Sequence, residues 1–155
     1  VKNALLFNVL SYLSDKLLTE GNTVAALDEL YIWLSDNVAV GTTIIEYIRN
    51  CLKRVRKKES AMLLASQNLE DFNQEGIREL TKPLFAIPPH QFLFNAGAVD
   101  KKFYMEALQL EESEYNLIRF PQRGVCLYRC GNERYLLEVH APAYKEALFG
   151  KAGGR

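Results

Sequence analysis

Cysteine and histidine are scarce in this chain, which has three cysteines and two histidines among 155 residues. A low and odd cysteine count argues against a secreted framework held together by disulfides. Cys126 and Cys130 lie four residues apart in a strand-like segment, and no second pair supplies the other ligands of a thiolate metal site. We therefore expect these two thiols to be buried or half-buried side chains of the core.

The chain also has no excess charge of either sign, since 19 basic and 19 acidic residues give a formal net charge of zero. Binding nucleic acid over the whole surface needs surplus positive charge, so only a local basic patch stays open. No apolar run reaches the roughly 20 residues that a membrane-spanning helix needs, and no secretory signal is visible. The missing initiator methionine and the tail KAGGR favour an excised fragment.

What the sequence does have is helical and strand-like segments in alternation. Apolar residues recur at helical spacing from Val1 to Thr19 and from about Thr43 to Lys58. The stripes expected to face the core are Leu5, Leu6, Val9, Leu10, Leu13 and Leu17 in the first segment, and Ile44, Ile48, Leu52 and Val55 in the second. Shorter helices are expected at about Gln74 to Leu80 (broken by Pro83), from a cap at Asp100 to about Leu108, from about Ser113, and in PAYKEALFG.

Short apolar runs that stop at polar residues predict buried strands. Thr23 to Leu27 and Ala61 to Ser66 are such runs, and His90 to Gly97 is a third candidate. The helix between the first two has the length of a right-handed crossover, so these strands should be parallel neighbours. Two more strands flank Gly131 and form a hairpin. The predicted fold class is α/β, with a mostly parallel sheet, helices on both of its faces, and a C-terminal antiparallel hairpin.

Polar residues at the ends of the two parallel strands suit nucleotide hydrolysis. Asp28 and Glu29 follow the first strand, and Gln67 follows the second. Ligands bind beyond the carboxyl ends of the strands in an open α/β sheet. Hydrolysis of a nucleoside triphosphate needs a carboxylate for Mg²⁺, a group that activates the attacking water, and positive charge for the transition state. Asp28 fits the first role, Glu29 fits the base, and Gln67 fits a sensor of the γ-phosphate; the plainer alternative is three solvated loop residues.

These segments resemble the VirB-four-like conjugation ATPases of type IV secretion systems, including those of Gram-positive conjugative elements. The likeness is carried by TVAALDEL, by a helix ending in RVRKKE, and by AMLLASQNLEDF. In that family a strand ending in Asp-Glu is the Walker B motif, an Arg-Lys helix end follows, and the next strand ends in Ser-Gln-Asn or Thr-Gln-Asn with an Asp beyond it. The matching positions are Asp28, Glu29, Arg56, Lys57, Ser66, Gln67, Asn68 and Asp71.

The resemblance implies a partial RecA-like P-loop NTPase sheet, with this chain as a single-domain fragment, the C-terminal half of that domain. Residues 1–82 would hold the Walker B and glutamine motifs, and residues 83–155 the C-terminal strands and helices. ATP and Mg²⁺ would be the cofactors, with Asp28 and Gln67 at the nucleotide and Asp28 at the metal. Glu29 and Gln67 would be catalytic.

The resemblance also implies partners and a location. Such motors would form homo-hexamers that work with other type IV secretion components, in the cytoplasm at the inner face of the membrane and associated with it peripherally. Contact with DNA is left open. Arg56, in preference to Arg54, would reach the nucleotide of a neighbouring subunit. The alternative for these basic residues is an ordinary solvated helix end that offsets the helix dipole.

Three features depart from the family pattern, and the first, an aromatic shifted after the Asp-Glu pair to Tyr31 and Trp33, is harmless for the chemistry. The phosphate-binding loop, GxxxxGKS or GxxxxGKT, occurs nowhere in the sequence, so the chain by itself should be inactive. The family's Gly-rich turn before the second strand is replaced by Lys58, Glu59 and Ser60. Two alternative functions therefore stay open: a non-catalytic assembly or docking module of the secretion machinery, and a DNA-pumping ATPase of the coupling-protein or FtsK type, which has the same motif order.

Overall fold

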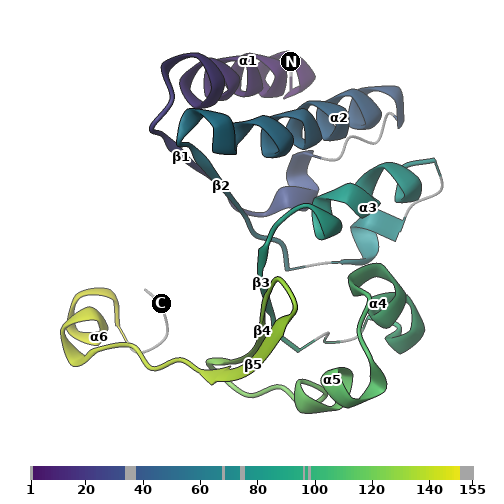
Figure 1. Ribbon diagram of the computed structural model, residues 1–155, viewed down its shortest axis with the longest axis vertical. Coiled ribbons are helices and arrows are strands. Elements are labelled where there is room, and N and C mark those ends of the chain that lie inside the picture. Colours follow the sequence, from purple (N-terminus) through teal and green to yellow (C-terminus); the bar gives the residue numbers. More distant parts are fainter. Residues whose placement is uncertain are drawn as a thin grey trace. The chain divides into compact units, whose positions relative to one another are not determined.

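Helices and short strands alternate along the chain (Figure 1). The computed structural model describes residues 2–33, 38–67, 69–73, 76–95, 97 and 99–150. The residues form two compact units: unit 1 is Val1–Pro88 with Ala98–Gln109, and unit 2 is Pro89–Gly97 with Leu110–Arg155. None of the described helices has both the length and the apolar character needed to cross a membrane.

The two long predicted helices are present in unit 1. Helix α1 spans Lys2–Asp15 and continues into a π-helical turn, Lys16–Glu20. Helix α2 spans Val38–Arg54 and ends in the 3₁₀ turn η3, Val55–Lys58. Both helices contribute side chains to the main core cluster. Its buried members are Leu10, Leu27, Leu30, Ile44, Ile45, Ile48, Phe72, Ile77 and Leu84.

The stripe predicted for α1 is only half right. Leu10 and Leu17 are buried, whereas Leu5 and Val9 are exposed. The six apolar residues span a wider arc than one helix face that packs against α2, so one part of the stripe meets the core and the other part meets solvent.

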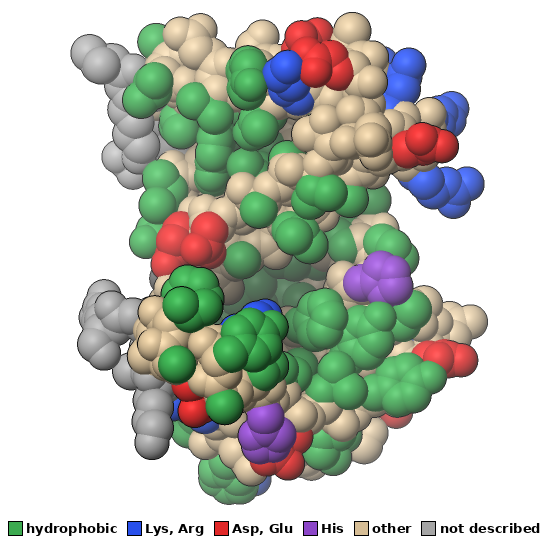
Figure 2. All heavy atoms as spheres, turned by 90° about the vertical axis from the view of Figure 1, so that its left-hand side faces the viewer, with side chains coloured by type: hydrophobic (Ala, Val, Ile, Leu, Met, Phe, Trp, Pro, Cys, Tyr) green, Lys and Arg blue, Asp and Glu red, His purple; other side chains and the backbone are tan. Residues whose placement is uncertain are grey.

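The predicted parallel pairing of the first two strands is confirmed. Strand β1, Val24–Leu27, pairs in parallel with strand β2, Ala61–Leu64, and α2 lies between them in sequence. The expectation of strands buried on both faces is wrong for the described residues, because Val24 is 67% exposed and Leu63 is 62% exposed. Side chains alternate across a strand, so the helices that bury Ala25 and Leu27 leave the opposite face of the sheet uncovered. Figure 2 shows hydrophobic side chains at the surface in one view of the molecule.

The turn from η3 into β2 lies against the amino end of β1. The Asn22 N–H donates to the Lys58 carbonyl oxygen at 2.9 Å. A Cβ atom at Gly21 would lie 2.7 Å from the same oxygen, and Gly21 has a φ of +77°, so only glycine fits there. Glu59 adopts the left-handed conformation, with a φ of 53°. Glu59 therefore has a left-handed backbone in the turn where the family that the sequence resembles has glycines, which adopt this conformation readily.

Helix α3 corrects another expectation. It spans Arg78–Ala86 and runs through Pro83, which was expected to break it, while Gln74 lies outside the described residues. A proline inside a helix removes one backbone donor. The Ile87 N–H donates to the Pro83 carbonyl oxygen at 2.9 Å, so the turn after the proline still closes. The buried side chains of Thr81 and Leu84 hold this helix on the core.

The cap predicted at Asp100 is confirmed. Helix α4 spans Lys101–Leu108, and the Asp100 carboxylate accepts a hydrogen bond from the Phe103 N–H at 2.9 Å. This bond satisfies one of the backbone donors that a helix leaves free at its N-terminus. Tyr104 and Leu108 bury the inner face of α4.

Replacing Asp100 with alanine should lower the free energy of unfolding by about 1 kcal/mol, because the Phe103 N–H loses its acceptor. Asp100→Asn keeps a side-chain oxygen at the same position and should lose only a small part of that amount. Urea unfolding followed by circular dichroism measures both variants. Equal losses for the two would show that the carboxylate charge, rather than the capping bond, stabilises α4.

Unit 2 contains an antiparallel sheet in the order β3–β4–β5, formed by His90–Leu93, Val125–Cys130 and Glu133–Glu138. The predicted C-terminal hairpin is confirmed as β4 and β5. The mostly parallel sheet is wrong for the described residues, because β3 pairs with β4 in antiparallel orientation and only β1 and β2 are parallel. Helix α5 spans Glu112–Leu117, and helix α6 spans Ala143–Phe149.

Candidate functional site

The carboxyl ends of β1 and β2 are tied together by backbone hydrogen bonds beyond the strands themselves. The Ala65 N–H donates to the Leu27 carbonyl oxygen at 2.9 Å, and the Leu30 N–H donates to the Ala65 carbonyl oxygen at 2.8 Å. These bonds hold the backbone on both sides of Asp28 and Glu29 against the segment that leads to Gln67. Because Asp28 and Glu29 follow β1 and Gln67 follows β2, all three residues lie at the same edge of the parallel pair.

Glu29 and Gln67 are in direct contact. The Gln67 amide nitrogen donates to Glu29 Oε1 at 2.5 Å, across 38 positions of the sequence. The second carboxylate oxygen, Glu29 Oε2, is buried and accepts no hydrogen bond from the residues that the structure describes. A buried polar atom is normally paired, so an unpaired carboxylate oxygen at a strand end marks a site for a further polar group.

The backbone at Glu29 is unusual as well. Its φ is 49°, in the left-handed region that residues other than glycine seldom adopt. The Asp28 carboxylate supports this conformation, because its Oδ1 accepts a hydrogen bond from the Glu29 N–H at 2.9 Å. Such strain is concentrated at functional sites, where the surrounding structure over-determines the conformation.

Asp28 has the properties that a Mg²⁺ ligand requires. Its side chain is exposed, and carboxylate oxygens are hard donors that suit this ion. Among the described residues, no group of three or more His, Cys, Asp and Glu side chains gathers into a closed metal cage. Mg²⁺ usually binds through one or two carboxylates together with waters and phosphates, so an open site at Asp28 fits it better than a cage would.

Arg56 is not brought to this site. It is exposed on η3, which lies against the amino end of β1, whereas Glu29 follows the carboxyl end of the same strand. Asn68, which belongs to the resemblance, lies outside the described residues. A role for Arg56 therefore needs the nucleotide of another subunit, as the resemblance implies.

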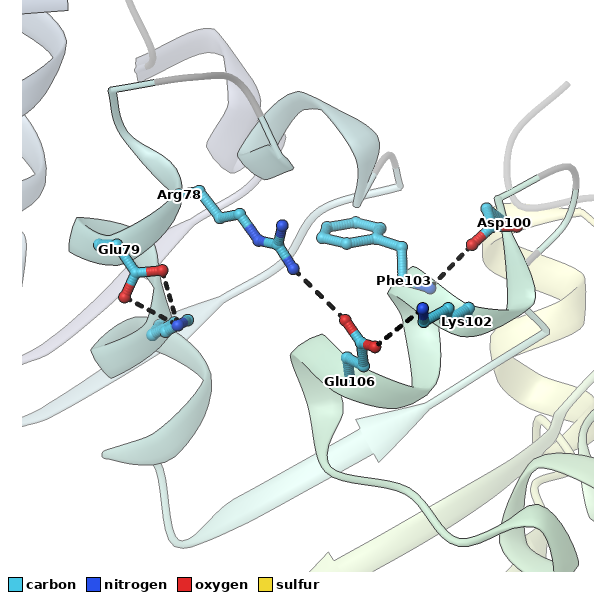
Figure 3. A network of polar contacts seen from close by, with 7 residues as sticks. Arg78, Glu79, Asp100, Lys102, Phe103 and Glu106 are labelled. Atoms are coloured by element: carbon cyan, nitrogen blue, oxygen red, sulfur yellow. Dashed lines mark hydrogen bonds and ion pairs between the residues drawn. The ribbon is translucent and has the colours of Figure 1, made fainter.

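A second cluster of charged residues lies between α3 and α4 (Figure 3). Arg78 reaches toward Glu106, with its Nη2 3.4 Å from Glu106 Oε2, and its guanidinium also lies over the Phe103 ring. The ion pair is exposed to solvent, where such pairs contribute little stability. The hollow beside it is lined by Phe72, Arg78, Thr81, Lys82, Phe85, Phe103, Glu106 and Ala107.

Unit 2 has a row of aromatic side chains that sequence patterning does not reveal. Phe92, Tyr128 and Tyr135 are direct cross-strand neighbours on β3, β4 and β5. Ring centroids are 4.7 Å apart for Phe92 and Tyr128, and 6.1 Å apart for Tyr128 and Tyr135. His90 Nδ1 and the Tyr128 hydroxyl share a hydrogen bond of 2.8 Å. His90 and Phe92 lie two residues apart in β3 and so share one face, but the register that aligns the three strands is not visible in sequence.

The expectation for the thiols is confirmed. Cys126 is buried and Cys130 is half-buried, and both are free cysteines. Burial raises the pKa of the Cys126 thiol, which keeps it protonated and poorly reactive at neutral pH.

The chain superposes on the solved structure of VirB4 of Thermoanaerobacter pseudethanolicus with a TM-score of 0.81. The match covers 94% of this chain at 27% sequence identity. This chain is VirB4-like. The VirB4-like chain spans only 39% of the length of that relative. No protein-family model matches the sequence, and no curated protein matches it either.

Proposed function

We propose that this VirB4-like chain is part of a motor ATPase that powers type IV secretion, with DNA transfer in conjugation as its task. The single observation that carries the proposal is the contact between Glu29 and Gln67 at the carboxyl edge of the parallel strands. Likeness to VirB4 adds support from outside the site. In this proposal the motor is a homo-hexamer at the inner face of the membrane, together with other secretion components.

Each residue of the site, and Arg56 outside it, has a role in the proposed reaction. Asp28 would hold Mg²⁺, which neutralises charge on the transferred phosphoryl group. Glu29 would accept the proton of the attacking water as general base. Gln67 would contact the γ-phosphate or the water, and Arg56 would stabilise the transition state at the nucleotide of a neighbour. The decisive test is hydrolysis of ATP by the intact protein, the natural polypeptide that contains residues 1–155, and its loss in a Glu29 variant.

The isolated 155-residue chain is expected to bind Mg²⁺-ATP negligibly, because its sequence has no phosphate-binding loop. Most of the binding energy for the phosphates comes from the backbone N–H groups and the lysine of that loop. Isothermal titration calorimetry on the chain measures this directly. A dissociation constant in the micromolar range would contradict the expectation and would place a phosphate site within residues 1–155.

A non-catalytic assembly module is the second candidate, and the exposed apolar face of β1 and β2 favours it. Val24 and Leu63 lie on that face and offer apolar surface to a partner. An intact protein that neither binds nor hydrolyses ATP but still joins the secretion machinery would support this candidate. Hydrolysis that DNA stimulates would instead favour a pump of the coupling-protein or FtsK type.

A further inference from the structure

The hollow between α3 and α4 lies within unit 1, because all the residues that line it belong to that unit. Its volume is about 140 Å³. A cavity of about 150 Å³ is enough to hold one benzene ring, whereas pockets for drug-sized molecules usually measure about 300–1,000 Å³. The hollow therefore has room for a single aromatic ring, which is the size of one anchoring side chain.

The inner wall of the hollow is aromatic and firmly placed. Phe72, on the 3₁₀ turn η4 (Glu70–Asn73), is 1% exposed, and its ring meets the Phe85 ring edge to face with centroids 5.4 Å apart. The Thr81 hydroxyl lies 3.2 Å from the Phe72 carbonyl oxygen and 2.9 Å from the Arg78 carbonyl oxygen, so the backbone occupies its hydrogen. This hydroxyl ties η4 to α3 and leaves the wall apolar.

The rim of the hollow, in contrast, is charged. Arg78 and Lys82 are exposed there, together with the acidic residue Glu106. The Arg78 guanidinium carries several N–H donors, yet its one hydrogen bond among the residues that the structure describes goes to Glu106 at 3.4 Å. The same guanidinium lies over the Phe103 ring (Figure 3). A guanidinium with donors to spare beside an apolar hollow suits a ligand in which a carboxylate lies next to a ring.

Glu106 competes only weakly for that guanidinium. The Arg78 and Glu106 side chains are 46% and 51% exposed, and ion pairs in such surroundings contribute little stability. Lys102 Nζ also lies 4.0 Å from Glu106 Oε1 (Figure 3), so Glu106 keeps a cation near it when Arg78 meets another acceptor. Two cations and one anion line the hollow, and this balance favours an acidic ligand.

We propose that this hollow is a docking site for an acidic segment of a partner protein. One phenylalanine or tyrosine ring of the partner fills the hollow, and a neighbouring aspartate or glutamate binds Arg78. A single aromatic anchor in a fitted pocket is typical of the residues that dominate binding between proteins. Nothing in this contact requires a nucleotide, so it is independent of the proposed ATPase function.

The probe is a synthetic peptide, acetyl-GSXDEG-amide, in which X is para-fluorophenylalanine. Fluorine NMR of the peptide, titrated with the intact protein, reports whether the ring leaves water. We expect a saturable change with a dissociation constant of roughly 0.1–1 mM, because one ring and one ion pair supply the affinity. The neutral peptide acetyl-GSXNQG-amide should bind about fivefold more weakly, since it lacks the charge for Arg78.

Arg78→Gln should remove this preference, so that R78Q binds both peptides with the affinity that wild type has for the neutral one. Arg119→Gln is the matched control. The Arg119 guanidinium also lies over a phenylalanine ring, Phe120, but in unit 2 and away from the residues that line the hollow. R119Q should keep both affinities at wild-type values.

Ala107→Phe tests the hollow itself, because Ala107 lines it and the new ring would occupy the space. We expect A107F to bind both peptides at least about tenfold more weakly than wild type. Circular dichroism shows whether A107F is folded. Should it unfold, the comparison of R78Q with R119Q still decides the proposal.

Three results would overturn the site: no saturable change below about 5 mM peptide, equal binding by wild type and folded A107F, or an acidic preference that survives in R78Q. Two others would overturn the partner protein as its occupant. Phenylacetate that displaces the peptide at equal concentration would mean that small aromatic acids bind here. A smaller sedimentation coefficient for folded A107F than for wild type would mean that a second copy of the chain fills the hollow.

Discussion

Glu29→Gln in the intact protein is expected to lower ATP turnover by about 10²–10⁴-fold while leaving nucleotide affinity unchanged, because an amide cannot accept the proton of the attacking water. The amide has nearly the shape of the carboxylate, so the strand end and its neighbours should keep their positions. Phosphate release gives kcat, and calorimetry with a slowly hydrolysed ATP analogue gives the dissociation constant.

The control for this variant is Glu46→Gln, the same chemical change on the exposed side of α2. It should leave both turnover and affinity at wild-type values. Turnover above about a tenth of wild type in Glu29→Gln would reject Glu29 as the base. Loss of affinity in Glu29→Gln would point instead to a folding defect at the site, which circular dichroism of the variant would reveal.

Leu10→Ala should lower the free energy of unfolding by about 2–5 kcal/mol, whereas Leu5→Ala should change it by less than about 0.5 kcal/mol. Both leucines lie on α1, but Leu10 is 3% exposed in the main core and Leu5 is 62% exposed. Truncation at Leu10 leaves a cavity in the main core cluster, and truncation at the exposed Leu5 leaves none.

The pair is its own control, since residue type, substitution and helix are the same. Urea unfolding of the two variants gives both free energies. A large loss at Leu5 would mean that this side of α1 is covered in solution, either by another copy of the chain or by another protein. Equal, small losses at both positions would mean that α1 does not pack on the core.

The sequence was most informative where a local rule acts on its own. Helical spacing located α1 and α2, the turn at Gly131 located the hairpin, and the side-chain chemistry of Asp100 located a cap. These features depend on residues close together in the chain, so no knowledge of tertiary contacts is needed. The parallel pairing of β1 and β2 also followed, because a single helix of suitable length connects them.

Exposure and strand partners could not be predicted in the same way. A run such as VAAL is apolar at every position, so its sequence does not say that Val24 faces solvent while Ala25 is buried. Strand β3 is HQFL, and nothing within this short sequence selects an antiparallel partner over a parallel one. Register and coverage depend on contacts between distant segments.

The candidate site was predictable in its members but not in its detail. Strand ends that carry Asp28, Glu29 and Gln67 implied one shared edge, and the structure has Glu29 and Gln67 in contact there. The left-handed backbone of Glu29 and the unequal surroundings of its two oxygens have no sequence signature. Arg56 was grouped with the site by resemblance alone, and its place on η3 leaves that role a prediction.

The left-handed backbone at Glu29 sets the stability of the strand end against the proposed role of its carboxylate. A residue other than glycine in such a conformation lowers the free energy of unfolding by about 1–3 kcal/mol, and glycine would restore that stability. Random mutagenesis that selects only for thermal tolerance should therefore enrich Glu29→Gly and produce a hardier protein without its proposed base. Glutamate at this position lowers the stability of the strand end. In the proposed function, it also supplies a carboxylate whose backbone is held in a fixed conformation.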